Sequence, residues 1–292
     1  MRIAIVGLGG VGAYLAASFA KAGIDVVGFG RGEHLAAIKK DGLRIVEDHQ
    51  EWRVDLDARE IGDADGYFDG VLFCVKSYDL EDAYRAIEPF IDEKSFLISF
   101  SNGVNNGDRL RALSSAAVLD GAVYILSHIQ EAGVIRKKGK VFAAVFGGDA
   151  AATQKLALLF EQAALRYKTP SDIKKALYKK YIFIAAFATL TSYYDKPIAA
   201  IYKEHFLEVK ALLEEIAAVA KAEGVDIDDE VQKALDTAAK LPSDASTSMH
   251  LDFQNNKQTE LESLSGYIAK NKAVATPLMG KFYKQLSSKN SV

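Results

Sequence analysis

The first 168 residues alternate between short apolar runs and amphipathic segments. Four continuous apolar runs are typical of strands buried on both faces of a sheet. They cover residues 3–6, 24–29, 70–76 and 95–100. Segments with the 3.6-residue spacing of amphipathic helices separate or follow them. These cover residues 11–22, 34–42, 77–90 and 151–165. This alternation predicts an α/β domain with a largely parallel sheet.

Further strand patterns occur in the same half, and some of these strands should be antiparallel. They cover residues 43–47 and 52–57, which suit a hairpin, and 117–138, 140–148 and 166–170. After Pro170 the chain shows only helical patterns, which begin at Ser171 and recur near 204–223, 229–240, 257–270 and 277–288. We therefore predict a Rossmann-type dinucleotide-binding domain over residues 1–168 and an all-helical domain over 169–292. Substrate sites commonly lie between such domains, so we expect a cleft there to hold the substrate.

The first predicted strand runs directly into a glycine motif, Gly7-Leu8-Gly9-Gly10-Val11-Gly12. In a G-x-G-x-x-G of this kind, Gly7 would permit a tight turn and Gly9 would let a pyrophosphate approach the backbone. Gly12 would let the next helix pack close to the strand. The positive end of that helix suits phosphate groups. A plain turn is the alternative, but a second strand follows at β-α-β spacing and favours a dinucleotide site.

The end of the second strand decides between NAD and NADP. An NAD-binding protein usually has a carboxylate there to bind the ribose 2′-hydroxyl. This chain has Arg31, whose planar guanidinium suits a 2′-phosphate. Asp25 lies too early in the strand to reach the ribose, whereas Glu33 is close enough to compete. A solvated loop arginine is the alternative interpretation, and we expect NADP(H).

Two charged residues of the helical half lie on or beside apolar helix faces. Lys180 lies within a stripe of helical spacing, between Leu177 and Ile184, whereas Lys179 lies on the polar side. Glu260 lies at the margin of a second apolar face. Charges at apolar surfaces are costly unless they are paired or functional. The alternatives are a lysine that reaches solvent at the domain edge and an acid that complements the helix dipole.

Composition narrows the remaining classes of function. A net charge of −3 gives no reason to expect nucleic acid or an anionic membrane as a partner. The single cysteine, Cys74, excludes an intrachain disulfide and a cysteine-based zinc site, and the five histidines are scattered, so we expect no metal. The longest apolar stretch, 181–190, is too short to span a bilayer, and no signal-peptide pattern is visible. A cytoplasmic protein is therefore expected.

Taken in order, these motifs resemble those of the ketopantoate reductase (2-dehydropantoate 2-reductase) family over essentially the full length. The family pattern has the glycine motif, an arginine after the second strand, a Val-Lys and a Gln-Asn-Gly after later strands, and a lysine within a helix. A Ser-Ser-Met-x-x-Asp and a Thr-Glu follow. The matching residues here are Gly7, Gly9, Gly12, Arg31, Lys76, Asn102, Lys180, Ser248 within 247–252, and Glu260.

This resemblance implies NADPH-dependent reduction of a 2-keto acid to a 2-hydroxy acid, with ketopantoate as the leading substrate. By the same resemblance, Lys180 would hold the keto oxygen and supply the proton, and Glu260 would orient the substrate or the lysine. Ser248 would bind the substrate, and Asn102 would position both substrate and nicotinamide. Lys76 would lie on the cofactor side, together with the glycine motif.

The chain departs from the family in part of the substrate site. The family usually has asparagines four and eight residues after the lysine, where this chain has Ile184 and Ala188. Both would lie on the same side of the helix as Lys180, facing the substrate. The identity of the substrate therefore stays open, and a less hydroxylated 2-keto acid is one alternative. A non-catalytic NADPH sensor is an alternative function. The expected partners are the small-molecule substrate and, in a possible homodimer, a second copy of the chain.

Overall fold

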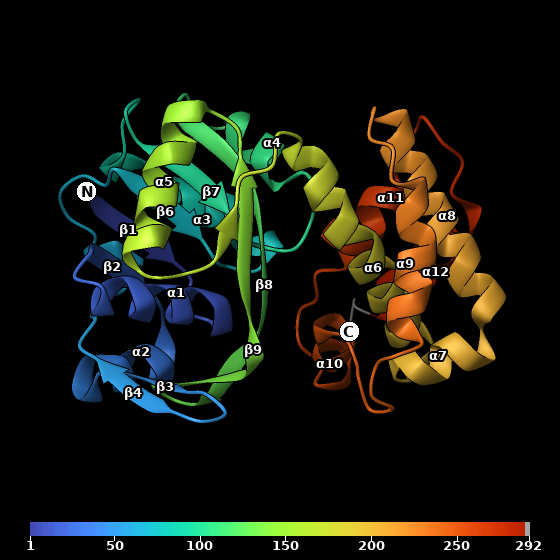
Figure 1. The fold of residues 1–292 in the computed structure, drawn as a ribbon, viewed down its shortest axis with the longest axis horizontal. Coiled ribbons are helices and arrows are strands. Elements are labelled where there is room, and N and C mark those ends of the chain that lie inside the picture. The colour runs from blue at the N-terminus through green and yellow to red at the C-terminus, as the bar shows by residue number, and fades with distance from the viewer. Residues whose placement is uncertain (290–292) are drawn as a thin grey trace. The chain divides into compact units, whose positions relative to one another are not determined.

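The computed structural model describes residues 1–289, which fall into two compact units (Figure 1). The first unit comprises Met1–Ser101 and Asn105–Ile173. The second comprises Asn102–Val104 and the chain from Lys174 onward. The short segment Asn102–Val104 therefore groups with the helical unit, although a strand of the first unit precedes it.

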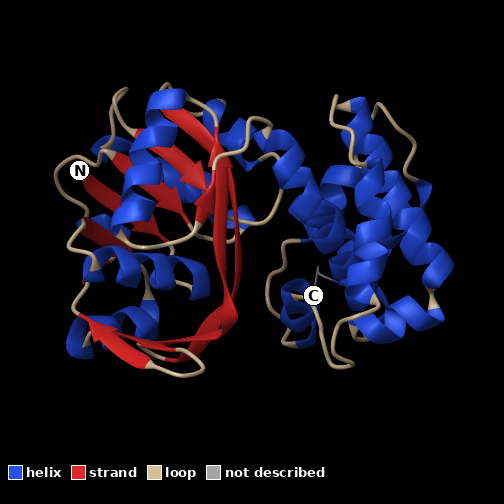
Figure 2. Ribbon diagram, in the orientation of Figure 1, coloured by secondary structure: helices blue, strands red, loops and turns tan. Residues whose placement is uncertain are grey.

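All strands of the first unit form one ten-stranded sheet (Figure 2). They are β1 (Arg2–Val6), β2 (Asp25–Phe29), β3 (Leu43–Val46), β4 (Glu51–Val54), β5 (Asp57–Arg59), β6 (Gly70–Phe73), β7 (Phe96–Ser99), β8 (Ala117–Glu131), β9 (Val134–Gly147) and β10 (Tyr167–Lys168). The order is β4-β3-β9-β8-β7-β6-β1-β2-β5, with β10 beside β9. The run β5-β2-β1-β6-β7-β8 is parallel throughout. This is the 3-2-1-4-5-6 order of dinucleotide-binding folds, and it confirms the predicted Rossmann-type α/β class.

Within residues 1–289, antiparallel pairing is confined to two hairpins. The expected hairpin of β3 and β4 is confirmed. Strands β8 and β9 form a long antiparallel ladder, and the sequence pattern placed its break wrongly, near Gly139. The chain turns at Gly133 instead, and Gly139 lies in a bulge within β9, where the register shifts between Ile125 and Leu126. Both glycines have positive φ, so the pattern alone does not tell a turn from a bulge.

Helices cover both faces of this sheet. They are α1 (Gly10–Lys21), α2 (Gly32–Asp41), α3 (Leu80–Ile87), α4 (Asn106–Arg111) and α5 (Ala150–Gln162). One core joins α1, α2 and α5 to the side of β1 that carries Ile3 and Ile5. The other joins α3 and α4 to the side that carries Ala4 and Val6. Alternate residues of each strand are thus buried on opposite faces, which explains the continuous apolar runs.

The second unit is all-helical, as the sequence predicts. Its helices are α6 (Ile173–Tyr194), α7 (Ile198–Glu204), α8 (Phe206–Ala222), α9 (Asp228–Ala238), α10 (Ser248–Gln254), α11 (Tyr267–Ala269) and α12 (Pro277–Lys289), with a π-helical segment, η4 (Glu262–Gly266). The helix expected over 257–270 starts later than predicted, because α10 and a left-handed Asn256 precede it. Within residues 1–289, no helix is both long and apolar enough to cross a membrane.

Candidate active site

The glycine motif forms a tight turn between β1 and α1. Gly7 has φ 103°, and a Cβ there would lie 2.7 Å from the backbone nitrogen of Val75. A Cβ on Gly12 would lie 1.9 Å from the carbonyl oxygen of Gly7, so only glycine allows this close packing of helix and strand. A Cβ on Gly9 would meet nothing within 4 Å. The motif therefore has a turn that requires glycine, a close backbone approach and an open side at Gly9, which fits a pyrophosphate.

The other residues of the motif, Leu8, Gly10 and Val11, pack against the rest of the first unit and do not form the open side of the loop. Leu8 is buried, and a Cβ on Gly28 would lie 2.8 Å from its side chain. A Cβ on Gly10 would lie 2.4 Å from the carbonyl oxygen of Ser127 in β8. Val11 is half-buried and packs against the core beneath α1. In the described chain, the first turn of α1 has neither a capping side chain nor an acidic residue, so its positive end is not neutralised.

Arg31 and Lys76 lie at the same edge of the sheet as the glycine motif. Arg31 follows β2 and precedes α2, and its side chain is 88% exposed. It contacts Asp79 in the turn after β6, with 3.4 Å between Nη2 and Oδ2. Lys76 begins that turn and is half-buried. Since β2, β1 and β6 are parallel neighbours, the segments that follow them meet at the carboxyl edge, where nucleotides bind such sheets.

Three predicted site residues of the second unit form one hydrogen-bonded cluster. The Lys180 Nζ donates to Oδ1 of Asn102 at 3.2 Å. The Asn102 Nδ2 donates to Oε2 of Glu260 at 3.3 Å. Glu260 is 4% exposed, whereas Lys180 and Asn102 are half-buried. Asn102 therefore bridges the cation and the carboxylate.

Burial changes the proton affinity of Lys180. Desolvation lowers the pKa of Lys180 to about 8, and the negative charge of Glu260 partly opposes that shift. A lysine with such a pKa is still protonated at neutral pH but releases its proton more readily than an exposed lysine. This property suits a proton donor.

Glu260 lies just before the π-helical segment η4. Its carbonyl oxygen accepts a hydrogen bond from Leu264 N at 3.0 Å, so its backbone is tied to the start of that helical segment. The hydroxyl of Tyr181 donates to the carbonyl oxygens of Ser263 at 3.1 Å and Leu264 at 2.6 Å. Such turns often occur at functional sites. The sequence hides this contact, because a tyrosine in the apolar stripe next to Lys180 indicates only packing.

Two other predicted substrate residues lie outside the hydrogen-bonded cluster. Ser248 is the first residue of α10 and is exposed. Ile184 is half-buried on α6, one turn after Lys180. Ala188 was expected to face the substrate as well, but it is 1% exposed and packs in the core of the second unit. Each four-residue step turns a position by about 40° around a helix, so the face reaches the core by the second step.

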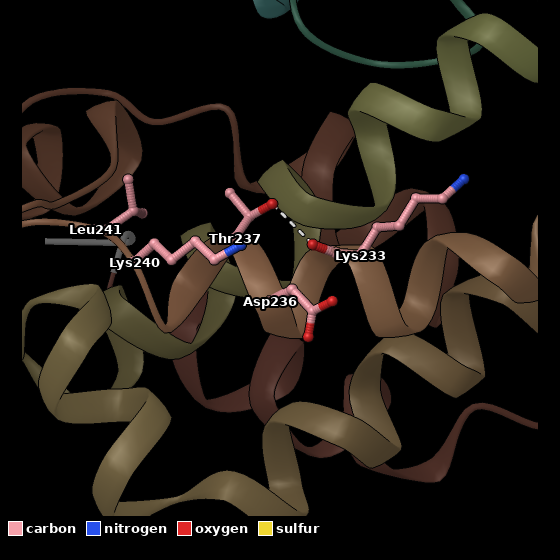
Figure 3. Close-up of a pocket in the computed structure, with 5 residues that line it drawn as sticks. All are labelled: Lys233, Asp236, Thr237, Lys240 and Leu241. Atoms are coloured by element: carbon pink, nitrogen blue, oxygen red, sulfur yellow. Dashed lines mark hydrogen bonds between the residues drawn. The ribbon is translucent and has the colours of Figure 1, made fainter.

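A surface hollow of about 390 Å³ in the second unit contains none of these residues. It lies on α9 and the turn after it, and its lining residues are Lys233, Asp236, Thr237, Lys240 and Leu241 (Figure 3). The hydroxyl of Thr237 donates to the carbonyl oxygen of Lys233 at 2.7 Å within the same helix. This hollow is an open feature of one helix and carries no functional assignment.

Known proteins resemble this chain over its whole length. Residues 3–148 match the family model described as "Ketopantoate reductase PanE/ApbA", and residues 172–290 match its C-terminal counterpart. The uncharacterized oxidoreductase YkpB of Bacillus subtilis is 29% identical, over 98% of each chain. The structure of a PanE/ApbA family ketopantoate reductase from Ralstonia eutropha is 28% identical with a TM-score of 0.92, over 99% of this chain and 98% of that one. A 2-dehydropantoate 2-reductase from Porphyromonas gingivalis is 31% identical with a TM-score of 0.84, over 98% and 99%.

Proposed function

The chain belongs to the ketopantoate reductase family, and on that basis we propose that it uses NADPH to reduce a 2-keto acid to the 2-hydroxy acid. Family membership makes it a nicotinamide-dependent oxidoreductase. The observation that carries the proposal is the cluster of Lys180, Asn102 and Glu260, because it supplies a half-buried proton donor with a lowered pKa. Ketopantoate is the leading named substrate, since several relatives are named 2-dehydropantoate 2-reductase.

Each residue has a role in this reaction. NADPH, when bound, supplies a hydride from C4 of its nicotinamide. The glycine motif and Arg31 bind the pyrophosphate and the 2′-phosphate, with Lys76 beside them. The Lys180 ammonium donates a hydrogen bond to the keto oxygen and then transfers its proton. Because negative charge develops on that oxygen only during the reaction, this cation stabilises the transition state more than the ground state.

The other two cluster residues prepare that lysine. Glu260 favours the charged form of Lys180, and Asn102 accepts a hydrogen bond from Nζ and so orients it. Ser248 hydrogen-bonds the substrate in this proposal, and Ile184 lines its less polar side.

A spectrophotometric screen of NADPH oxidation tests this function. We expect oxidation with ketopantoate, with a branched 2-keto acid that lacks its hydroxyl, or with both. Calorimetric titration with NADPH would be run on the same preparation. If NADPH binds tightly but no 2-keto acid causes its oxidation, the proposed reductase activity is contradicted. That result would favour a nucleotide-binding sensor.

Arg31→Ala should weaken binding of NADPH far more than binding of NADH. A charge-assisted contact with phosphate contributes about 1.5–3 kcal/mol, so wild type should prefer NADPH by about tenfold or more. The Arg31 side chain can turn toward a phosphate, because it is 88% exposed and its contact with Asp79 is long, at 3.4 Å. Dissociation constants of both cofactors would be measured for wild type, Arg31→Ala and the control Arg85→Ala, which alters an exposed arginine of α3. Equal affinity of wild type for both cofactors would contradict the assignment.

Ile184→Asn should shift substrate preference toward ketopantoate. The Ile184 side chain cannot hydrogen-bond the substrate hydroxyl, and an unpaired buried hydroxyl costs about 1–3 kcal/mol. Wild type should therefore reduce the branched 2-keto acid with a kcat/KM within about tenfold of that for ketopantoate. Ala176→Asn, one turn before Lys180, is the matched control and should leave the kcat/KM ratio unchanged. A several-hundredfold preference of wild type for ketopantoate would show that other polar groups bind the hydroxyl.

A further inference from the structure

The short helix α10 carries Ser248 and is seven residues long. Its Met249 is buried in the core of the second unit and Phe253, one turn later, packs against that core, whereas Leu251 is 50% exposed. Irregular segments precede and follow this helix. This apolar contact is limited to two side chains of a seven-residue helix, so polar contacts add to what holds α10 in place.

The buried ring of His250 makes two such contacts. Its Nδ1 lies 2.6 Å from the hydroxyl oxygen of Ser246, and its Nε2 lies 2.8 Å from Oδ1 of Asp195. The His250 side chain is 4% exposed. Since a carboxylate can only accept, Nε2 carries a hydrogen, and in the neutral ring Nδ1 then accepts from Ser246. Both ring nitrogens are thereby satisfied.

Asp195, the partner of His250 Nε2, lies directly after the end of α6. It follows the last residue of α6, Tyr194, and has φ 52°, a left-handed conformation that costs energy for a residue other than glycine. Gln254 Nε2 also donates to Oδ1 of Asp195, at 2.9 Å. The two hydrogen bonds from α10 hold the pKa of the Asp195 carboxyl below its usual value. Two residues of α10, one turn apart, thus bind the same carboxylate oxygen.

A second contact joins the same two helices. The hydroxyl oxygens of Thr191 in α6 and Thr247 before α10 lie 2.9 Å apart. Thr247 also caps α10, because its side chain accepts from His250 N at 3.3 Å. The hydroxyls of Ser246 and Thr247 therefore make hydrogen bonds that hold α10, whereas the neighbouring Ser248 is exposed.

We propose that His250 and Asp195 are positioning residues that fix α10, and with it the Ser248 hydroxyl, relative to the helix that carries Lys180. The inference rests on the proposed function, since it assigns Ser248 to the 2-keto acid. In this role, the His250–Asp195 contact determines how tightly the keto acid binds and leaves the cofactor site and the proton donor untouched.

Asp195→Ala is the sharpest variant, because this side chain is 73% exposed and its removal leaves the apolar core intact. The KM for the keto acid should rise about tenfold, the scale of one lost charge-assisted hydrogen bond, while kcat and the KM for NADPH change by less than about twofold. Asp195→Asn should restore most of the affinity, because it keeps the acceptor oxygen and tolerates a left-handed backbone. His250→Ala should behave like Asp195→Ala.

A double-mutant cycle with Ser248 decides whether these residues act through that hydroxyl. Ser248→Ala alone should raise the KM for the keto acid, and adding Asp195→Ala should raise it little further. Independent, multiplicative effects would overturn the proposal. Amide hydrogen exchange of residues 248–254 gives a readout without substrate, and it should quicken in Asp195→Ala and His250→Ala. Unchanged exchange would also overturn the proposal, whereas a wild type inactive on every keto acid would reject only the proposed function.

Discussion

Lys180→Ala should lower kcat by about 100-fold or more, the usual effect of removing a positioned general acid. The structure gives the physical reason: Nζ is half-buried, hydrogen-bonded to Asn102 and close enough to Glu260 to be influenced by its charge. Removing the ammonium takes away both the proton and the positive charge that stabilises the developing oxyanion. NADPH affinity should barely change, because the glycine motif and Arg31 belong to the other unit. Steady-state kinetics and NADPH titration would measure the two effects separately.

Lys179→Ala is the matched control for this experiment. The Lys179 side chain is 40% exposed, and its Nζ pairs with Oε1 of Glu230 at 3.1 Å. The Glu230 side chain is 12% exposed and also pairs with Lys233 Nζ at 2.8 Å, so it keeps a positive partner in the variant, and kcat should stay near the wild-type value. Two neighbouring lysines with equal effects on kcat would contradict the assignment of the proton donor to one helix face.

The α/β unit could be predicted well because its signals are local. A strand buried on both faces leaves a continuous apolar run, and the Gly7–Gly12 motif marks where the first strand ends. The helix α10 left a weaker signal, since it is seven residues long and its apolar face consists of Met249 and Phe253. The break near Gly139 was wrong for a similar reason, because a glycine at a bulge resembles a glycine at a turn.

The candidate site was predictable only in part. Lys180 is conspicuous because a charge interrupts an apolar stripe, and the family resemblance identified Asn102 and Glu260. The hydrogen bonds of Asn102 connect it to residues 78 and 158 positions away, and no periodicity reports contacts over such separations. The support from Tyr181 could not be read from the sequence either, because it depends on a π-helical turn that brings two carbonyl oxygens to one hydroxyl.

The rate of reduction should fall above pH 8, because the reaction needs Lys180 in its protonated form. The pKa of this lysine is lowered to about 8 by burial, so kcat/KM for the keto acid should be level below that pH. It should then fall about tenfold per pH unit above it, as expected for loss of one essential proton. A pH profile at saturating NADPH would measure the midpoint of this decline.

Glu260→Gln should move that midpoint to lower pH. The negative charge of Glu260 raises the pKa of Lys180 against the effect of burial, so removing the charge lets desolvation lower the pKa further. The variant should therefore lose activity at pH 8 and regain part of it in more acidic buffer. Glu230→Gln is the control, because it removes a carboxylate paired with Lys179 instead, and its midpoint should match wild type. A midpoint that stays fixed in Glu260→Gln, or moves to higher pH, would mean that Glu260 does not act on the proton of Lys180.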